Sequence, residues 1–303
     1  MKPELKKNIS MIGAPLDLGA SLRGVSLGPD AIRYAGIKER LERIGYDVID
    51  EGNVSVKKEE AFTVPGSNLK NMNVIVEANK ELCEKVDTAL KKGNFPLVLG
   101  GDHSIAIGTI KGVLHNIKNL GVIWFDAHGD INTDKTSPTG NIHGMPVASL
   151  LGYGVRDLKE IGGEEYKLNK KNFVFIGSRD LDAPERETMK ELGMHVFTMH
   201  EVDKMGIVAV MEEAIRIASN GTDGIHVSFD MDVLDPEVAP GTGTKVKGGM
   251  GYREAHLSLE LIAKTEKLVS AEFVEINPLL DHENMTGEAV VSLAGSLLGE
   301  WLI

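Results

Sequence analysis

Short apolar runs alternate along the chain with longer segments in which apolar residues recur at helical spacing. Eight of the short runs are rich in branched and aromatic side chains, which predicts buried strands. They cover residues 10–14, 46–50, 95–99, 121–125, 172–177, 195–198, 224–230 and 268–276. Strands that alternate with helices predict a parallel sheet with right-handed crossovers. No linker or shift in composition interrupts this rhythm, so we expect one domain over residues 1–303.

The same pattern predicts where several helices begin and end. Apolar residues near the 3.6-residue period predict a long helix over residues 69–92. Another helix is expected over residues 201–219, and we expect Thr286 to cap the last helix of the chain. Counting strands leaves two architectures open, a (β/α)₈ barrel and an open three-layer sandwich.

Three polar residues follow the fourth predicted strand at alternate positions. Asp126, His128 and Asp130 come directly after the apolar run 121–125. In an extended chain, residues at i, i+2 and i+4 point to the same side, so these three can converge on one point. Two carboxylates and an imidazole at a buried strand end would repel and desolvate one another, and a cation relieves both problems. This stretch by itself also permits a hydrogen-bonded turn with chance acidic residues.

Polar side chains follow other predicted strands in the same way. His103 follows the third strand, Asp230 and Asp232 follow the seventh with i, i+2 spacing, and Glu275 ends the eighth. The ends of parallel strands lie on one edge of a sheet, where open α/β sheets bind their ligands. Together these motifs offer four aspartates and two histidines, whereas a tetrahedral zinc site uses about four ligands.

An oxygen-rich ligand set with some imidazole suits Mn²⁺ or another hard divalent ion. Two ions about 3.5–4 Å apart that share carboxylates would use all six groups. Such a pair lowers the pKa of a bridging water and supplies hydroxide near neutral pH. The residues therefore indicate metal-assisted hydrolysis without an organic cofactor.

Composition narrows the partners of this site. Hydrophobic residues make up 42% and charged residues 26% of the chain, which is typical of a soluble globular protein. The formal net charge of −12 disfavours nucleic acid and anionic membranes as partners and is compatible with a cationic substrate. The single cysteine, Cys83, cannot form an internal disulfide, and we expect it in the core. No stretch approaches the ~20 apolar residues of a membrane span, so we expect a cytoplasmic protein.

Three motifs together resemble those of the ureohydrolase family, which includes arginases and agmatinases. They are Gly-Gly-Asp-His ending at His103, Asp-Ala-His-Gly-Asp at residues 126–130 and Ser-Phe-Asp-Met-Asp at residues 228–232. The similarity extends from Gly13 to Leu298. It implies a three-layer α/β/α sandwich on an eight-stranded parallel sheet, and so favours the sandwich over the barrel. It also implies two Mn²⁺ ions, one held by His103, Asp126, Asp130 and Asp232 and the other by Asp126, His128, Asp230 and Asp232.

The loop that follows the second motif is most similar to that of arginases, bacterial ones above all. This resemblance implies a manganese-dependent hydrolase that converts L-arginine to L-ornithine and urea, with a metal-bridging hydroxide attacking the guanidinium carbon. Thr139 stands where arginases usually have Ser, and Lys245 and Lys247 replace residues that are usually apolar. The residues implied to bind the α-carboxylate are Asn132, Ser137, Thr139 and Asn141.

The resemblance also implies catalytic roles for three residues. Asp130 would accept the proton of the hydroxide, His143 would shuttle protons to solvent, and Glu275 would orient the guanidinium group. Further substrate contacts would come from Asp182 and Glu185, at the α-ammonium group, and from Thr244. From the residues alone, His143 could be an ordinary loop histidine, and Glu185 could pair with Arg179 or Arg186.

Three other functions remain open. The first is a sister ureohydrolase that acts on agmatine or another guanidino compound. The second is a catalytically dead metal-binding or assembly protein on the same fold, and the third is a mononuclear zinc amidohydrolase of the deacetylase type. Bacterial arginases are usually hexamers, so the resemblance implies a homo-oligomer, either a hexamer or a trimer.

Overall fold

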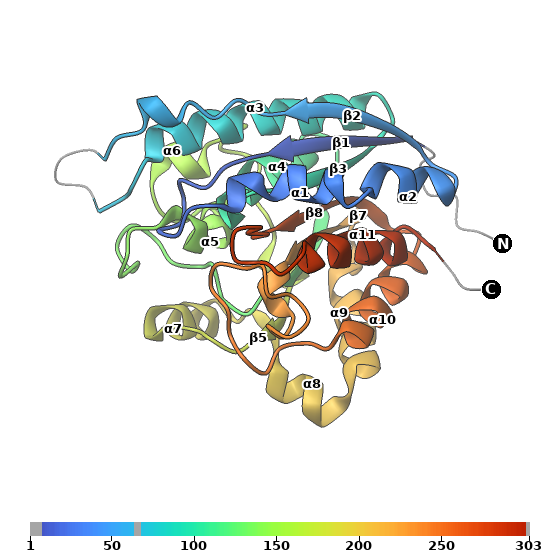
Figure 1. The fold of residues 1–303 in the computed structure, drawn as a ribbon. Helices are drawn as coiled ribbons and strands as arrows, with labels where there is room; N and C mark the ends of the chain where they lie inside the picture. Colours follow the sequence, from blue (N-terminus) through green and yellow to red (C-terminus); the bar gives the residue numbers. More distant parts are fainter. Residues whose placement is uncertain (1–7, 64–67, 301–303) are drawn as a thin grey trace.

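An open eight-stranded sheet runs through the centre of the molecule (Figure 1). The structure is a computed structural model and describes residues 8–63 and 68–300. All strand pairs are parallel, in the order β2-β1-β3-β8-β7-β4-β5-β6. The strands are β1 (Asn8–Ala14), β2 (Asp47–Asn53), β3 (Phe95–Gly100), β4 (Leu120–Phe125), β5 (Phe173–Ser178), β6 (His195–Thr198), β7 (Gly224–Asp230) and β8 (Leu268–Val274).

Every predicted strand is present, which confirms the prediction of a parallel α/β fold. The sheet is open, because β2 and β6 lie at its two ends and each pairs with one neighbour only. Most residues of these end strands are partly or fully exposed, whereas the inner strands are almost entirely buried. Nearly continuous apolar runs are what a strand covered on both faces requires.

Helices cover both faces of the sheet and complete a three-layer sandwich (Figure 1). Each face has its own hydrophobic core. One core includes residues of α1 (Gly28–Tyr34), α2 (Ile37–Arg43), α8 (Met199–Met205), α9 (Ile207–Ala218), α10 (Tyr252–Ala263) and α11 (Met285–Leu297). The other includes residues of α3 (Met72–Lys91), α4 (Ala106–Leu114), α5 (Pro146–Leu150), α6 (Arg156–Lys159) and α7 (Ala183–Leu192).

Two of the predicted helix boundaries are wrong. The helix expected over residues 201–219 is interrupted at Gly206, whose φ of 80° and ψ of 147° only glycine adopts readily, so α8 and α9 are separate. Thr286 does not cap α11, because Asn284 occupies that position. The hydroxyl of Thr286 instead donates a hydrogen bond to Asp281 Oδ1 at 2.9 Å.

Across residues 8–63 and 68–300, no helix is both long enough and apolar enough to span a bilayer.

Candidate metal centre and active site

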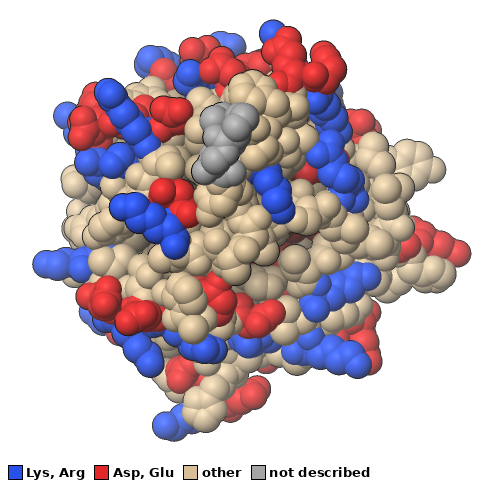
Figure 2. Space-filling model, turned by 90° about the vertical axis from the view of Figure 1, so that its left-hand side faces the viewer, with Lys and Arg blue, Asp and Glu red and all other residues tan. Residues whose placement is uncertain are grey.

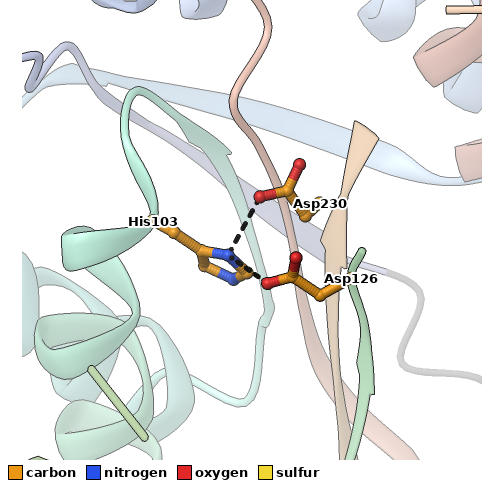
Figure 3. Close-up of side chains that lie close together, drawn as sticks. All are labelled: His103, Asp126 and Asp230. Atoms are coloured by element: carbon orange, nitrogen blue, oxygen red, sulfur yellow. Dashed lines mark hydrogen bonds and ion pairs between the residues drawn. The ribbon is translucent and has the colours of Figure 1, made fainter. Parts of the chain in front are cut away.

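The carboxyl ends of the four central strands meet at one edge of the sheet. These strands lie side by side in the order β3-β8-β7-β4. His103 follows β3, Glu275 follows β8, Asp230 ends β7 and Asp126 follows β4. In Figure 3 the ring of His103 and the carboxylates of Asp126 and Asp230 point toward one another. Segments far apart in the sequence therefore bring these polar side chains together, as the sequence predicted.

Three carboxylates surround one ring nitrogen of His103. Its Nδ1 lies 3.2 Å from Asp126 Oδ2, 3.1 Å from Asp130 Oδ2 and 3.1 Å from Asp230 Oδ2. All four side chains are buried. Ionised carboxylates only accept hydrogen bonds, and buried charges need compensation. These four buried side chains converge on one position, and such a set of donor atoms can hold a cation.

A second group of possible ligands adjoins the first. His128 Nδ1 lies 3.1 Å from Asp232 Oδ2 and 3.5 Å from Asp126 Oδ1. Asp126 therefore takes part in both groups, since its Oδ2 faces His103 and its Oδ1 faces His128. The donor atoms of His103, Asp126 and Asp230 lie within 4.8 Å of one another, and so do those of Asp126, His128 and Asp232. The residues fit two divalent cations that share a carboxylate.

The arrangement differs in one respect from the ligand division that the family resemblance implied. Asp230 faces His103, whereas Asp232 faces His128 and accepts a hydrogen bond from Thr244 Oγ1 at 2.8 Å. Asp230 is the last residue of β7, and Asp232 lies in the 3₁₀ turn η6 (Met231–Val233) that follows. The distances therefore favour Asp230 as the partner of His103.

Burial and mutual repulsion shift the pKa values of these acids. Burial, together with the charge of Asp126, raises the pKa of Asp130 to about 6. Burial and the charges of neighbouring aspartates raise the pKa of Asp230 well above its usual range. Burial acts in the same direction on Asp126, but hydrogen bonds with His103 and His128 outweigh it and lower the pKa. Without a cation, burial and mutual repulsion therefore disfavour the charged forms of Asp130 and Asp230, and a bound cation would relieve that repulsion.

Two of the predicted catalytic residues have a left-handed backbone. The φ angle is 50° at Asp130 and 64° at Glu275. Such a conformation costs of order 1–3 kcal/mol at a residue with a side chain and persists only where the surroundings impose it. Here the backbone hydrogen bonds from Val147 N to Asp130 O at 3.0 Å and from Glu275 N to Gly101 O at 2.8 Å hold both residues. Strain of this kind concentrates at functional sites.

His143 and Glu275 face each other beside the metal groups. His143 Nδ1 lies 3.3 Å from Glu275 Oε1, which also accepts a hydrogen bond from the backbone N–H of His103 at 2.8 Å. Burial opposes the charged imidazole, but the carboxylate of Glu275 outweighs it and raises the pKa of His143 to about 9. His143 therefore differs from a solvent-exposed loop histidine, because its contact with Glu275 favours the protonated imidazole at the edge of the site.

A pocket of about 210 Å³ opens at this edge of the sheet. Its walls include His143 and three of the predicted metal ligands, His128, Asp130 and Asp230. A larger hollow of about 910 Å³ borders α3 and α6 and contains no predicted site residue. All seven residues predicted to bind substrate also line the smaller pocket: Asn132, Ser137, Thr139, Asn141, Asp182, Glu185 and Thr244.

The strands point toward the face that Figure 2 shows. On this face Lys, Arg, Asp and Glu side chains surround a largely uncharged central area with a hollow in it (Figure 2). Lys245 and Lys247, the two departures noted in the sequence, are exposed, and nothing in the structure explains them.

One wall of the pocket is built around the start of α7. Asp182 caps this helix, with Oδ1 accepting from Glu185 N at 2.8 Å and Oδ2 accepting from Asn132 Nδ2 at 2.8 Å. The side chain of Glu185 returns a hydrogen bond to the backbone N–H of Asp182, which completes a capping box. The alternative in which Glu185 pairs with Arg179 or Arg186 is not observed in the described part of the chain.

The sequence did not identify the residues that contact the candidate metal ligands and hold their side chains in place. Trp124 Nε1 donates to Asp126 Oδ2 at 2.9 Å, and the indole stacks on the His103 ring with centroids 4.0 Å apart. Ser228 Oγ lies 2.8 Å from His103 Nε2. A signal was available, since Trp124 and Ser228 each precede an aspartate ligand by two positions and so share its side of the strand.

Arg179 is a second supporting residue that the sequence did not identify. Its Nη2 donates to the carbonyl oxygens of Asp232 at 2.7 Å and of Val246 at 2.8 Å. Its Nη1 donates to the carbonyl oxygen of Val233 at 3.1 Å. The guanidinium group therefore ties the η6 turn to the loop that carries Thr244.

Comparisons with known proteins agree with this geometry. The arginase family model matches residues 7–299. An arginase from Brevibacillus brevis is 54% identical over 299 residues, covering 99% of this chain and 100% of the relative.

Two solved structures are similar to the whole chain. An arginase from Bacillus caldovelox has a TM-score of 0.95 at 52% identity, covering 98% of this chain and 100% of that chain. An arginase from Bacillus cereus has a TM-score of 0.94 at 52% identity with the same coverage. With the metal groups and the pocket already located in this fold, the chain belongs to the arginase family.

Proposed function

We propose that the chain acts as an arginase and hydrolyses L-arginine to L-ornithine and urea. The observation that carries the proposal is the pocket, in which metal-ligand candidates and the residues expected to bind an amino acid line a single space of about 210 Å³. The high identity to arginases over the whole chain supports the same activity.

Two Mn²⁺ ions are the metals we propose for this site. His103, Asp126, Asp130 and Asp230 would hold one ion, and Asp126, His128, Asp230 and Asp232 would hold the other. When bound, divalent ions of this kind polarise water and supply a nucleophile near neutral pH. Oxygen-rich ligands with some imidazole suit manganese better than zinc, which favours nitrogen and sulfur.

The residues beside the ligands would bind the guanidinium group and move protons. Asp130, which lines the pocket beside the other proposed ligands, would accept a proton from the attacking water. Glu275 would pair with the cationic guanidinium group. His143, with a pKa of about 9, would carry protons between the leaving amine and solvent. Thr244 would lie beside the guanidino end through its contact with Asp232.

The other end of the pocket would hold the amino-acid group of the substrate. Asp182 and Glu185 would attract the α-ammonium group, and they are held in place by the capping box of α7. The α-carboxylate would receive hydrogen bonds from the side chains on the loop beyond Asp130, which are Asn132, Ser137, Thr139 and Asn141. A homo-oligomer, either a hexamer or a trimer, is the assembly that the family resemblance favours, and we propose a cytoplasmic location.

Urea release after Mn²⁺ loading tests the proposed function. We expect urea and L-ornithine from L-arginine, with much weaker turnover of agmatine, which lacks the carboxylate. Asp126→Ala removes the ligand shared by both metal groups and should abolish urea release, while the purified variant keeps its far-ultraviolet circular dichroism. Absence of urea from arginine with tight binding of two Mn²⁺ ions per chain would instead favour a metal-binding protein without this activity, and turnover of agmatine alone would favour a sister ureohydrolase.

A further inference from the structure

Lys70 lies directly behind a wall of the substrate pocket, and sequence reasoning gave it no role. Its Nζ donates to Asn141 Oδ1 at 2.9 Å and approaches Ser21 Oγ at 3.3 Å. Asn141 lines the pocket and is one of the residues expected to bind the α-carboxylate. Lys70 is half-buried. An ammonium group therefore stands one side chain away from the space that a substrate carboxylate would occupy.

Lys70 forms no ion pair with any residue in the described ranges 8–63 and 68–300, since its ammonium faces only neutral oxygens. The side chains that line the pocket supply no lysine or arginine, and five of them are acidic: Asp130, Asp180, Asp182, Glu185 and Asp230. Asp180, Asp182 and Glu185 are not proposed metal ligands, and their negative charge when ionised attracts the cationic end of arginine but repels its carboxylate. A nearby positive charge without a carboxylate partner can offset that repulsion.

The segment that carries Lys70 is fixed to the substrate loop. Lys70 N donates to Gly140 O at 3.2 Å, and Asn68 Nδ2 donates to Asp134 O at 2.8 Å. On the other side, Asn71 Nδ2 donates to Leu18 O at 3.0 Å. These contacts hold the backbone of residues 68–71 between two loops, so the ammonium group is delivered to a defined place.

The contact also determines how the amide of Asn141 is oriented. An ammonium group only donates hydrogen bonds, so it requires the amide oxygen, and not the NH₂ group, on its side. The NH₂ group of Asn141 then donates one hydrogen bond to Ser21 Oγ at 2.9 Å and has a second N–H left. That N–H is available to a carboxylate in the pocket.

We propose that Lys70 is a specificity-determining residue that makes the pocket select substrates carrying an α-carboxylate, by adding positive charge behind Asn141 and fixing the orientation of its amide. It acts through Asn141 and is therefore a positioning residue. The inference rests on the proposed arginase function, because it concerns the carboxylate end of that substrate. Within the described residues, the hydrogen bonds of Lys70 go to Ser21, Asn141 and Gly140, none of them a proposed metal ligand or catalytic residue, so we expect it to affect binding and not the chemical step.

Three variants of Lys70 test this role. Lys70→Met removes the charge and the hydrogen bond, and should raise KM for L-arginine roughly tenfold at unchanged kcat, since only ground-state binding is lost. Lys70→Gln can still donate to Asn141 but carries no charge, and should also raise KM. Lys70→Arg keeps the charge and should recover most of the affinity.

Calorimetry gives a readout that does not depend on turnover. The dissociation constant of L-ornithine should rise with Lys70→Met by a factor similar to KM, whereas that of 1,4-diaminobutane, which lacks the carboxylate, should not rise. Lys85→Met is the matched control, because Lys85 is also half-buried and, among the described residues, its Nζ donates a hydrogen bond only to the backbone oxygen of Glu51, at 3.3 Å. It should leave KM and both dissociation constants unchanged.

The outcomes separate this inference from the proposed function. Urea release by the wild-type chain tests only the proposed function. The ratios of KM and of the dissociation constants between variant and wild type test the role of Lys70. Unchanged KM and ornithine affinity in Lys70→Met would overturn the inference, as would equal weakening of ornithine and 1,4-diaminobutane. Wild-type KM in Lys70→Gln would overturn the charge contribution, and a loss confined to kcat would show damage to the loop instead.

Discussion

At the scale of single residues, Glu185 combines a structural and a functional position. It is buried at the start of α7, its side chain completes the capping box with Asp182, and it lines the pocket. Burial is the main cause that raises its pKa to about 7, and the charge of Asp130 acts in the same direction. The folded protein therefore holds a proton that the unfolded chain would release near the ordinary pKa of 4.5.

This shift has a defined consequence for stability. Because the folded-state pKa is raised, the folded state binds more protons, and the contribution of Glu185 to stability is lost as pH rises from about 4.5 to about 7. Glu185→Gln keeps an oxygen that can accept from the N–H of Asp182 but never ionises. We expect its melting temperature, relative to wild type, to be higher at about pH 8 than at about pH 5. Thermal unfolding of metal-free protein at both pH values checks this, and an equal difference at both would contradict it.

At the scale of the elements, the sequence predicts the strands and the polar residues at their ends well. It predicts less well where helices break and which residues hold the loops of the site in place. A buried parallel strand leaves a continuous apolar run, and the acid or histidine after it stands out, which is why residues 121–130 could be interpreted directly. The break at Gly206 was missed because a glycine inside an apolar periodic segment is compatible with a continuous helix. Arg179 was missed because its partners are backbone oxygens, which have no signature in the sequence.

Lys111 illustrates the same limitation within a helix. It lies on α4, is 0% exposed, and donates from Nζ to the backbone oxygens of Lys159 and Tyr166, each at 2.6 Å. Burial lowers its pKa to about 8. The ammonium group thereby fastens the segment around α6 to α4, on the face of the sheet that also carries α3.

The substitution Lys111→Met should therefore destabilise the fold without changing the enzymatic activity. The substitution leaves two partly buried carbonyl groups without their donor, and each loss costs on the order of 1 kcal/mol. We expect a lower midpoint of denaturant unfolding with KM for arginine unchanged. Lys80→Met, which removes an exposed pair with Glu77, is the control and should change the midpoint little. A normal midpoint in Lys111→Met would mean that water replaces the ammonium group.

At the scale of the whole molecule, the fold gathers acidic charge at one edge. The chain has a formal net charge of −12, and the ends of β4 and β7 alone add four buried aspartates: Asp126, Asp130, Asp230 and Asp232. The sheet order that brings β8 and β7 between β3 and β4 creates this meeting point. No local pattern specifies that order, which is why the sequence alone left barrel and sandwich open until the family resemblance decided between them.

Such an edge should make the stability of the fold depend on metal. A ligand that binds only the folded state stabilises it in proportion to the logarithm of its concentration above Kd. Chelation should therefore lower the melting temperature of the purified protein, and added Mn²⁺ should restore it in a concentration-dependent way. Calorimetry or dye-free thermal unfolding across a Mn²⁺ series measures the effect, and a melting temperature that ignores both chelator and Mn²⁺ would contradict it.

The substitution Asp230→Asn should affect stability differently with and without metal. A simple loss of packing would lower the stability in both cases. The asparagine keeps an oxygen for the N–H of Asp232, which donates to Asp230 Oδ1 at 2.8 Å, and has nearly the same shape. Burial and neighbouring aspartates disfavour the carboxylate of Asp230, so its removal should leave the metal-free protein as stable as wild type or more so. The same change removes a ligand and should sharply reduce the stabilisation by Mn²⁺. If the metal-free variant were much less stable than metal-free wild type, Asp230 would stabilise the fold without a metal. Metal binding would then not explain why these acids gather at one edge of the sheet.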